Sequence, residues 1–201
     1  MKHELSPELL IEAYASGIFP MGMSENEILW YSPDPRGILP LEGFHTPYGL
    51  RRAIRRMSAP GWEIRIDSDF EGVIDACAAR EETWITRTIA RNYRELFRGG
   101  HAHSVEVWHE GLLVGGLYGV ALGGAFFGES MFHRTTDASK VALWHLVNLL
   151  KGNGFTLLDT QWITPHLTQF GAIEISRREY LLHLGEALGR KAKFLPRPTG
   201  G

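Results

Sequence analysis

Apolar and polar residues alternate strongly in the middle of the chain, beginning with SVEVWHE at residue 104. Alternation with a period of two is typical of a half-buried β-strand. Glycine-containing pairs interrupt it at Glu110-Gly111 and at Gly123-Gly124, where an antiparallel hairpin would turn. The pattern predicts an antiparallel meander over residues 104–131.

Apolar residues spaced three and four apart predict helices around this meander. The clearest helix covers 137–151, where Leu143 begins an i, i+3, i+4, i+7 series and glycines follow the last turn. Ser6 and Pro7 form a helix start, and Gly17 can end that helix. Further expected elements are helices at 46–57, 69–79, 86–98 and 176–188, and strands at 62–66 and 155–163.

Three antiparallel strands followed by a helix and another strand describe an α+β domain. This order is compatible with the mixed sheet and flanking helices of an N-acetyltransferase. Residues 18–40 contain four prolines and predict an irregular segment with short extended pieces. The aromatic residues Phe19, Trp30 and Tyr31 favour packing of this segment over a free linker.

Composition narrows the class of protein without identifying a function. The 201 residues carry a formal net charge of -2, which gives no general positive field for nucleic acid, so such a site would be a local patch. Cys77 is the one cysteine, so no intrachain disulfide can form, and we expect a buried, inert thiol in a reducing compartment. No window approaches the roughly 20 apolar residues of a membrane span. We expect a soluble cytoplasmic protein.

The sequence LDTQ places an acid and an amide two residues apart in the strand expected at 155–163. Because side chains of a strand alternate between its faces, Asp159 and Gln161 should share a face. Gln161 cannot act as a general base, but Asp159 could orient it to accept a hydrogen bond from an amine. The alternative is a structural acid that caps a loop or pairs with a nearby arginine. The residues alone leave both interpretations open.

A second acid stands among apolar residues in the sequence FFGESMFH. A buried carboxylate is costly unless another group pairs with it. Strict alternation would place Glu129 on the same face as Phe127 and Met131, while the glycine before it could hold a bulge or admit a substrate. Glu129 is either a structural acid paired with Arg134 or Lys140, or a counter-charge for a cationic substrate.

Four arginines gather on the helix expected at 46–57, namely Arg51, Arg52, Arg55 and Arg56. At helical spacing several of them are neighbours, and like charges repel unless an anion lies between them. A solvated basic face and a contact with a phosphate backbone both fit this pattern.

The sequence contains no motif for a metal or a phosphate-bearing cofactor. His101 and His103 have no third ligand at recognisable spacing, and there is no H-E-x-x-H and no cysteine pair. The segment GGLYGVALGG contains no Walker lysine and no G-x-G-x-x-G. The strand-to-helix junction FHRTTDASK lacks the glycine-rich pyrophosphate loop of acyl-CoA enzymes. We expect no metal and no cofactor.

Eight motifs between residues 17 and 161 together resemble one family, and the resemblance spans roughly residues 5–184. They are GIFPM, WYSPDPRGILP, TWITR, GHAHSVEVW, LVGGLYGV, FFGESMF, ASKVAL and LLDTQ, and they look like leucyl/phenylalanyl-tRNA–protein transferase. The resemblance implies an N-acetyltransferase-like domain at 37–201, which uses no CoA, and a small N-terminal domain at 1–36 that contributes to the site for the tRNA 3′ end. It also implies transfer of Leu, Phe or Met from aminoacyl-tRNA to proteins with N-terminal Arg or Lys, which forms a degradation signal of the bacterial N-degron pathway.

The resemblance also assigns the residues of the site. Asp159 and Gln161 match the family's catalytic acid and amide, and Glu129 matches an acid beside the acceptor amine. Trp84 matches an aromatic residue that contacts the 3′-terminal adenosine, and Tyr93 matches another active-site aromatic residue. The positions around the amino-acid pocket correspond to Leu117, Phe126, Gly128, Ser130, Met131, Leu143, Leu146 and Leu150.

Some positions depart from the family pattern. Met21 stands where some members have a tryptophan that stacks on the adenine, and a thioether packs on a base more adaptably but less specifically. Leu146 and Leu150 stand where Phe occurs in other members, which implies a differently shaped pocket. The arginines at 51–56 lie in the region where the family places basic tRNA contacts.

The mechanism implied by the resemblance depends on positioning two substrates. Gln161, held by Asp159, would orient the acceptor amine or relay its proton. Glu129 would hold the cationic N-terminal residue, and a long apolar pocket would exclude charged and β-branched amino acids. The rival hypotheses are an acyl-CoA-dependent N-acetyltransferase and a non-enzymatic module that binds tRNA or peptide.

Overall fold

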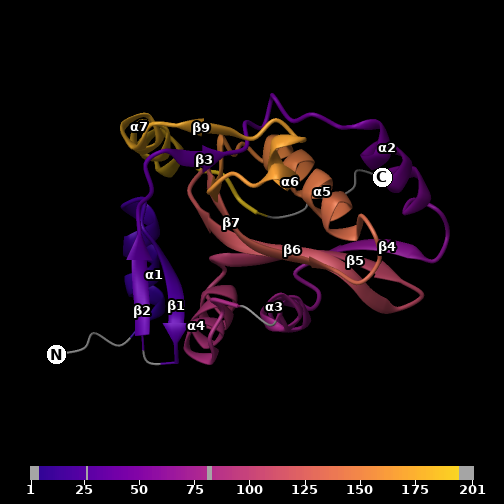
Figure 1. Cartoon of the computed structure of the whole chain (residues 1–201), viewed down its shortest axis with the longest axis horizontal. Coiled ribbons are helices and arrows are strands. Elements are labelled where there is room, and N and C mark those ends of the chain that lie inside the picture. The colour runs from indigo at the N-terminus through magenta and orange to yellow at the C-terminus, as the bar shows by residue number, and fades with distance from the viewer. Residues whose placement is uncertain (1–4, 26, 81–82, 195–201) are drawn as a thin grey trace.

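The computed structural model describes residues 5–25, 27–80 and 83–194, and within these ranges the chain forms a two-stranded and a seven-stranded sheet surrounded by helices (Figure 1). The helices are α1 (Pro7–Ala15), α2 (Tyr48–Arg56), α3 (Phe70–Ala78), α4 (Arg87–Arg98), α5 (Ala138–Gly152), α6 (Pro165–Thr168) and α7 (Arg177–Leu188). The strands are β1 (Phe19–Ser24), β2 (Glu27–Tyr31), β3 (Arg36–Ile38), β4 (Trp62–Ile66), β5 (Ala102–His109), β6 (Leu112–Leu122), β7 (Ala125–His133), β8 (Leu157–Gln161) and β9 (Ile173–Ile175).

The large sheet has the strand order β4-β5-β6-β7-β8-β3-β9. Strands β4 to β7 are antiparallel, which confirms the meander expected over 104–131. Helix α5 connects β7 to β8, and these two strands run parallel, while β3 joins β8 in the antiparallel direction. This mixed sheet with flanking helices confirms the expected fold class.

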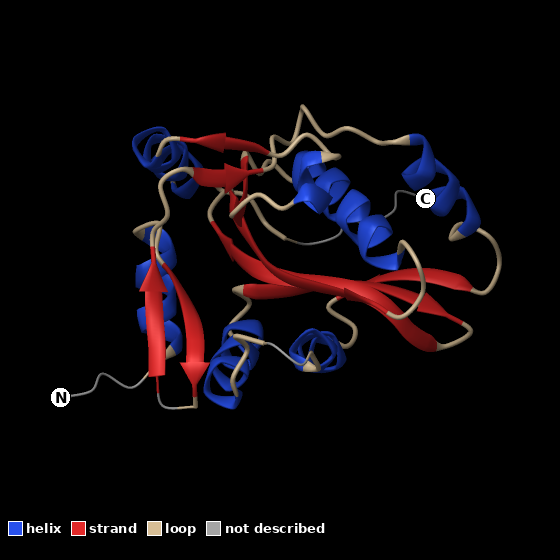
Figure 2. Cartoon of the chain, in the orientation of Figure 1, coloured by secondary structure: helices blue, strands red, loops and turns tan. Residues whose placement is uncertain are grey.

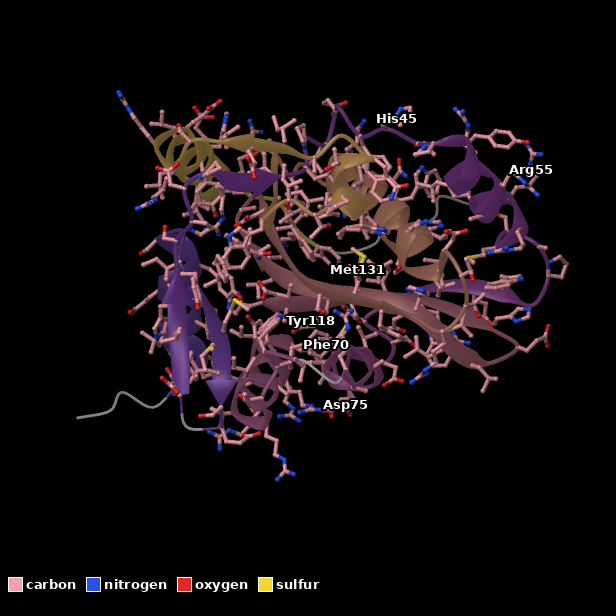
Figure 3. The ribbon with its side chains drawn as sticks, in the orientation of Figure 1. His45, Arg55, Phe70, Asp75, Tyr118 and Met131 are labelled. Carbon is pink, nitrogen blue, oxygen red and sulfur yellow. The ribbon has the colours of Figure 1, made fainter. Side chains whose placement is uncertain are left out.

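Helices cover both faces of the large sheet (Figure 2). In Figure 1, α3 and α4 lie on one face, and α5 and α2 lie on the other. Each face has its own apolar cluster, since Tyr118 packs with Phe70 of α3 whereas its neighbour Leu117 packs with α5. Figure 3 shows Tyr118 and Phe70 on one side of the sheet and Met131 on the other.

A β-bulge in β7 interrupts the alternation of side chains. The register between β6 and β7 shifts between Tyr118 and Gly119, which leaves Glu129 without an opposite residue. Such a bulge bends the strand and redirects a side chain. Phe127 consequently belongs to the cluster on the α3–α4 face, and Met131 packs on the α5 face. The expectation that these two residues and Glu129 share one face is therefore wrong.

Helix α1 and the β1–β2 hairpin pack beside the large sheet. Ser6 caps α1 by accepting the N–H of Leu9, and Gly17, with φ of 75°, follows the helix end, as the sequence predicts. The N–H of Gly22 in β1 donates to the carbonyl of Trp84 at 3.1 Å. A Cβ atom on Gly22 would lie 2.7 Å from that oxygen, so glycine permits the hairpin to dock closely against the loop before α4.

The segment 18–40, expected to be irregular with short extended pieces, forms β1, β2 and β3. Strand β3 belongs to the large sheet and lies between β8 and β9. The domain boundary expected after residue 36 therefore falls inside β3. The sequence pattern predicts neither β9 nor α6, which have only three and four residues.

Candidate active site

A cavity of about 420 Å³ lies where β7 and β8 separate. The two strands pair from Ala125 and Leu157 only as far as Phe127 and Asp159. Beyond this point, residues 128–131 of β7 and the end of β8 both line the cavity. Its volume falls within the range of about 300–1,000 Å³ that is usual for small-ligand pockets.

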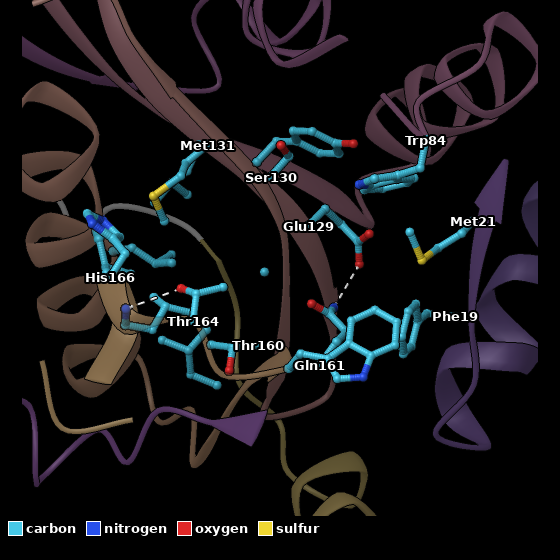
Figure 4. A pocket seen from close by; sticks show the side chains of 18 of the residues that line it. Phe19, Met21, Trp84, Glu129, Ser130, Met131, Thr160, Gln161, Thr164 and His166 are labelled. Atoms are coloured by element: carbon cyan, nitrogen blue, oxygen red, sulfur yellow. Dashed lines mark hydrogen bonds between the residues drawn. The ribbon is translucent and has the colours of Figure 1, made fainter. Parts of the chain in front are cut away.

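The cavity has two apolar ends with polar side chains between them. The aliphatic end is formed by Leu117, Met131, Leu143, Leu146, Leu158 and Leu167. The aromatic end is formed by Phe19, Met21, Trp84 and Trp162. Figure 4 shows Glu129 and Gln161 between Met131 on one side and Trp84 and Met21 on the other. One cavity thus offers two apolar surfaces separated by a carboxyl group and an amide.

Glu129 accepts hydrogen bonds from three different elements. Tyr14 of α1 donates to Oε1 at 2.7 Å, and Tyr93 of α4 donates to Oε2 at 3.0 Å. Nε2 of Gln161 donates to Oε1 at 3.4 Å. The hydroxyl groups of Tyr14 and Tyr93 also contact each other. The carboxyl group is therefore held in place while it remains half-buried in the cavity wall.

The two cations suggested as structural partners of Glu129 are engaged elsewhere. Arg134 donates to the carbonyl of Leu113 at 2.8 Å. Lys140 pairs with Asp137 at 2.8 Å. Neither cation forms an ion pair with Glu129, so the structure does not support the structural-acid interpretation in that form.

The pKa of Glu129 lies close to neutral pH. Desolvation raises its pKa to about 7, although the hydrogen bonds from Tyr14 and Tyr93 lower it. Desolvation also raises the pKa of both tyrosines, which keeps them as protonated donors. Three oxygen–oxygen contacts join these residues, but two hydroxyl groups supply only two protons. A third proton, on the carboxyl group, would make every contact a hydrogen bond, so this group is suited to taking up one proton.

Asp159 is fully buried and does not line the cavity. Its two oxygens accept from Nε and Nη2 of Arg36 at 2.9 and 2.6 Å. Tyr180 donates to Oδ2 at 2.7 Å, and the backbone N–H of Gln161 donates to Oδ1 at 2.8 Å. These four bonds use the acceptor capacity of a carboxylate. The structure agrees with the alternative in which Asp159 pairs with an arginine. Asp159 has no lone pair left to accept a hydrogen bond from a substrate.

Gln161 occupies a tight turn that ends β8. Its φ is 59°, and the N–H of Trp162 donates to the carbonyl of Thr160 across it at 2.7 Å, which defines a γ-turn. A residue with a Cβ atom is strained in this conformation. Asp159 holds the turn through the backbone N–H of Gln161, and the amide side chain is left to face Glu129. The sequence predicts a contact between the side chains of Asp159 and Gln161. In the structure Asp159 instead accepts the backbone N–H of Gln161, because the turn ends the alternation of side chains along β8.

Most of the residues that the resemblance assigns to the site line the cavity, namely Met21, Trp84, Leu117, Gly128, Glu129, Ser130, Met131, Leu143, Leu146 and Gln161. Tyr93, Phe126 and Leu150 are fully buried and do not line it. Tyr93 reaches the site through its hydrogen bond to Glu129. Phe126 and Leu150 pack in the apolar cluster on the α5 face, so they support the wall from behind.

The four arginines of α2 are exposed and do not line the cavity. Figure 1 shows α2 at the end of the molecule opposite the β1–β2 hairpin. Figure 3 shows Arg55 at the periphery, whereas Met131 lies inside the molecule. Arg56 donates to the carbonyl of Thr136 at 2.8 Å. This basic cluster is a surface feature that is separate from the cavity.

Sequence reasoning did not single out several residues that form or support the site, among them Tyr14, Phe19, Arg36 and Trp162. Their partners are distant in sequence, since Tyr14 is 115 residues from Glu129 and Arg36 is 123 residues from Asp159. Tyr14 is part of an apolar helix stripe and carries no separate signal. Arg36 lies within the motif WYSPDPRGILP, which is the one indication that the sequence offers.

The described ranges contain no group of three His, Cys, Asp or Glu residues that could hold a metal ion. No helix in them is long and apolar enough to cross a membrane. Burial raises the pKa of Cys77 to about 12, so this thiol stays protonated and is not a nucleophile. Glu129 is the one carboxyl group on the described part of the cavity wall.

Comparison with solved structures gives a distant likeness in fold. The structure of L-PGS from Bacillus licheniformis superimposes with a TM-score of 0.50 at 12% sequence identity, covering 92% of this chain and 71% of that chain. A GCN5-related N-acetyltransferase from Kribbella flavida has a TM-score of 0.47 at 12% identity, over 84% of this chain and 60% of that one. At such identities the likeness concerns the fold alone.

Comparison of sequences gives much closer relatives. A leucyl/phenylalanyl-tRNA–protein transferase of Cereibacter sphaeroides is 56% identical over 194 residues, which are 96% of this chain and 89% of that protein. One of Paramagnetospirillum magneticum is 57% identical over 196 residues, which are 94% of this chain and 92% of that protein. Models of the leucyl/phenylalanyl-tRNA protein transferase and of its N-terminal domain match residues 38–185 and 3–34. The chain therefore belongs to the leucyl/phenylalanyl-tRNA–protein transferase family.

Proposed function

We propose that this protein transfers Leu, Phe or Met from aminoacyl-tRNA to the α-amino group of proteins that begin with Arg or Lys. The observation that carries the proposal is the single cavity in which Glu129 and Gln161 lie between an aliphatic and an aromatic end. The aminoacyl end of a charged tRNA has the same order of parts, with an apolar side chain, a polar ester and a planar base. The acceptor amine must meet the ester, which places it beside the two polar side chains.

The aliphatic end suits the side chain that is transferred. Leu143 and Leu146 of α5 line this end together with Met131 of β7, and all three belong to the apolar cluster on the α5 face. Burying a charged side chain in such surroundings without a partner is strongly unfavourable. Met131 has an adaptable thioether side chain, which supports acceptance of aliphatic and aromatic amino acids alike.

Glu129 supplies the negative charge for a cationic acceptor. It is the one carboxyl group on the described wall, and its pKa of about 7 leaves it partly ionised at neutral pH. An α-amino group has an unperturbed pKa of about 7.7–8.0, so the ionised Glu129 can attract the ammonium form and then take one of its protons. The contacts with Tyr14 and Tyr93 favour this uptake, because the added proton completes their set of hydrogen bonds.

The reaction then follows from the positions of these groups. The neutral amine attacks the ester carbonyl carbon, a C–N bond forms, and the C–O bond to the terminal ribose breaks. The ribose oxygen leaves with a proton from the attacking nitrogen, while Glu129 keeps the proton that it removed first. Nε2 of Gln161 donates to Glu129, and its carbonyl oxygen, which accepts no bond from the described residues, would accept an N–H of the amine. Much of the rate would come from positioning, since the ester is already activated.

Asp159 has a positioning role in this proposal. Its four hydrogen bonds fix Arg36, Tyr180 and the backbone of Gln161, but none of its oxygens reaches the cavity. The acid would therefore act on the reaction by holding the strained turn that presents the amide. This assignment modifies the hypothesis of a direct acid–amide relay.

The arginines of α2 are proposed contacts for the phosphate backbone of the tRNA. They are exposed and lie away from the cavity, which fits a contact with the tRNA body better than one with its 3′ end. Because charged tRNA is a cytoplasmic substrate, we place the activity in the cytoplasm. The modified protein would carry a new N-terminal Leu, Phe or Met, which serves as a signal for degradation.

The rival acetyltransferase reaction would need a pyrophosphate site at the start of α5. Asp137 is the N-cap of this helix and forms an ion pair with Lys140 at 2.8 Å, so an acidic group occupies the end where a phosphate would bind. The sequence before it also lacks a glycine-rich loop. These features favour transfer from aminoacyl-tRNA over transfer from an acyl-CoA.

The test is a transfer assay with two substrates. Leu-, Phe- and Met-tRNA carrying labelled amino acids are incubated with the protein and with peptides that differ only in an N-terminal Arg, Lys or Glu. We expect label on the Arg and Lys peptides and none on the Glu peptide. Labelled acetyl-CoA serves as the second donor and should give no product. Absence of transfer from all three tRNAs, or acetylation of the peptides, would overturn the proposal.

A further inference from the structure

A second cavity, of about 400 Å³, lies at the end of the large sheet where β6 turns into β7. It shares no lining residue with the candidate active site. Its wall comes from the start of β5, the β6–β7 turn, Phe155 before β8 and residues 192–194 after α7. Both histidines of the sequence HAH, His101 and His103, lie on this wall, and the function proposed above gives them no role.

His103 is held in place with one ring nitrogen left without a partner. The residue is 9% exposed, and its Nδ1 pairs with Oδ2 of Asp67 at 2.7 Å. Asp67 is fixed in turn, because its Oδ1 accepts the N–H of Ser104 at 2.8 Å. Nε2 of His103 forms no hydrogen bond with the described residues, and it is not sealed from solvent. A side chain that is nine-tenths buried therefore keeps one polar atom available at the cavity.

The segment after α7 closes one side of the cavity. The N–H of Gly124 donates to the carbonyl of Ala187 at 2.7 Å, which joins the β6–β7 turn to the end of α7. Phe194 then anchors the segment, since its ring stacks on His103 with centroids 4.3 Å apart and on Phe126 with centroids 5.2 Å apart. These contacts place Lys193, the residue before Phe194, at the cavity.

The polar side chains of the cavity wall all carry nitrogen, and no carboxyl group of the described residues lines it. Lys193 is exposed, and the described residues give it no ion pair. His101 has a fixed backbone, because its N–H donates to the carbonyl of Leu96 at 2.8 Å and its carbonyl accepts the N–H of Ala121 at 2.7 Å. Three side chains that can carry positive charge thus line one cavity. Such a wall favours an anion, because hydrogen bonds between cationic donors and phosphate or carboxylate are about twice as strong as neutral ones.

The rest of the wall indicates what kind of anion fits. Apolar side chains such as Leu122 and Phe155 also line the cavity, so part of the ligand is an uncharged organic group. A volume of about 400 Å³ lies in the usual range of about 300–1,000 Å³ for organic ligands and exceeds the need of a bare ion. Three nitrogen donors match the three acceptor oxygens of a phosphate monoester better than the two oxygens of a carboxylate.

We propose that this cavity binds a phosphate monoester, with His101, His103 and Lys193 as donors to its terminal oxygens. In its cationic form the ring of His103 donates Nδ1–H to Asp67 and Nε2–H to the ligand, so Asp67 orients the donor. A free nucleotide and the 5′-phosphate end of an RNA chain both carry this group. The proposal concerns binding alone and does not depend on the transfer reaction.

The test is a titration followed by NMR of the histidine ring nitrogens at constant ionic strength. The probes are AMP, adenosine, and one short oligoribonucleotide with either a 5′-phosphate or a 5′-hydroxyl. We expect saturable shifts at His101 and His103 with a phosphate-bearing probe and none with its phosphate-free counterpart. His109, which stacks on Trp62 at the other end of β5, should not move. A response to AMP assigns the site to free nucleotides, and a response to the phosphorylated RNA alone assigns it to RNA ends.

Substitutions then separate the cavity from general attraction to a basic surface. Lys193→Ala should weaken binding roughly tenfold, as loss of one charge-assisted hydrogen bond predicts. Lys191→Ala is the matched control, because Lys191 is also exposed but does not line the cavity. His103→Gln removes the cationic ring and should abolish the saturable shift at His101. Because Lys193 is exposed, its substitution leaves the core intact and decides the question even if His103→Gln does not fold.

Four outcomes would overturn the proposal. One is the absence of shifts at His101 and His103 with every phosphate-bearing probe, and another is an equal response to the phosphate-free probes. A third is equal weakening in Lys193→Ala and Lys191→Ala, which would indicate unspecific attraction. A fourth is a saturable response to Zn²⁺ with none to phosphate, which would assign the two imidazoles to a metal ion. Failure of the proposed transfer would leave these results unchanged, since none of them measures transfer.

Discussion

Removal of the Asp159 carboxylate is expected to damage folding and transfer by two separable routes. Arg36 and Asp159 are 1% and 0% exposed, and their side chains are joined by a bidentate contact. Asp159→Ala would leave the guanidinium of Arg36 buried without its counter-charge. It would also remove the acceptor for the backbone N–H of Gln161.

The size of the stability loss follows from this burial. Removing one partner of a buried ion pair costs about 3–5 kcal/mol, against a total stability of about 5–15 kcal/mol for a folded domain. Arg36 keeps a bond to the carbonyl of Gly17 at 3.0 Å, but Tyr180 loses the acceptor of its 2.7 Å bond. With a urea slope of about 2 kcal/mol per M, the unfolding midpoint should fall by roughly 2 M.

A double variant separates the charge from the turn. Replacing a whole buried ion pair with apolar residues is often neutral for stability, so Arg36→Met combined with Asp159→Leu should recover much of the lost midpoint. The N–H of Gln161 would still lack its acceptor, and a misplacement of about 1 Å lowers a rate by roughly 100-fold. We therefore expect a folded double variant with transfer reduced to that extent.

The assay combines urea unfolding, followed by tryptophan fluorescence, with transfer of Phe to an Arg peptide below the unfolding transition. Glu63→Ala is the control, because Glu63 and Arg65 form a pair on the surface at 2.9 Å with 55% and 36% exposure. Such a pair contributes about 0–1 kcal/mol. Two results would contradict these roles of Asp159. One is unfolding of Asp159→Ala at the wild-type midpoint, and the other is transfer by the double variant at the wild-type rate.

Other substitutions test the remaining parts of the site. The pKa of Glu129 is about 7 in the folded protein, against a usual 4.5. Between pH 4.5 and pH 7 the folded protein therefore keeps a proton on Glu129 that the unfolded chain has released. The free energy of unfolding consequently falls as pH rises through this range. Glu129→Gln cannot ionise, so at pH 8 its free energy of unfolding should exceed that of the wild type by up to about 3 kcal/mol, which raises its urea midpoint. At pH 4 the two midpoints should be nearly the same, and the variant should lose transfer. Equal midpoints at pH 8 would contradict the pKa. Tyr93→Phe removes a hydrogen bond that lowers the pKa of Glu129, so the acidic limb of the plot of kcat/KM against pH should move to higher pH. If that limb does not move, Glu129 does not control it. Gly37→Ala places a Cβ atom 2.7 Å from the carbonyl carbon of Trp162 and should reduce both transfer and stability. Gly49→Ala is the control, because its Cβ atom would meet nothing within 4 Å and should change neither. Similar losses in both variants would contradict the close packing of β3 against the turn.

The parts of the fold with a strong period were predictable from sequence. The helix expected at 137–151 is α5 at Ala138–Gly152, and the expected meander is β5 to β7. Their apolar spacing reflects burial of one face over many residues. β3 and β9 have three residues each, and so short a segment cannot show a period.

Most of the positions assigned to the site from sequence line the cavity, but their geometry could not be predicted. The bulge removes Glu129 from the face that alternation assigns to it, and the γ-turn does the same for Gln161. Both are single backbone departures from a regular strand, and the glycine before Glu129 was the one local indication. The contacts of Tyr14 and Arg36 with the two acids bridge more than a hundred residues, so no spacing rule could reveal them.

In the proposed complex one cavity binds the donor, with its side chain at the aliphatic end and its base at the aromatic end. The most direct measurement is a crystal structure of the protein with the 3′-amide analogue of phenylalanyl-adenosine. We expect the phenyl ring between Met131 and Leu146, the amide beside Glu129 and Gln161, and the adenine at the aromatic end of the cavity. A ligand bound in the reverse direction, or outside this cavity, would contradict this binding mode.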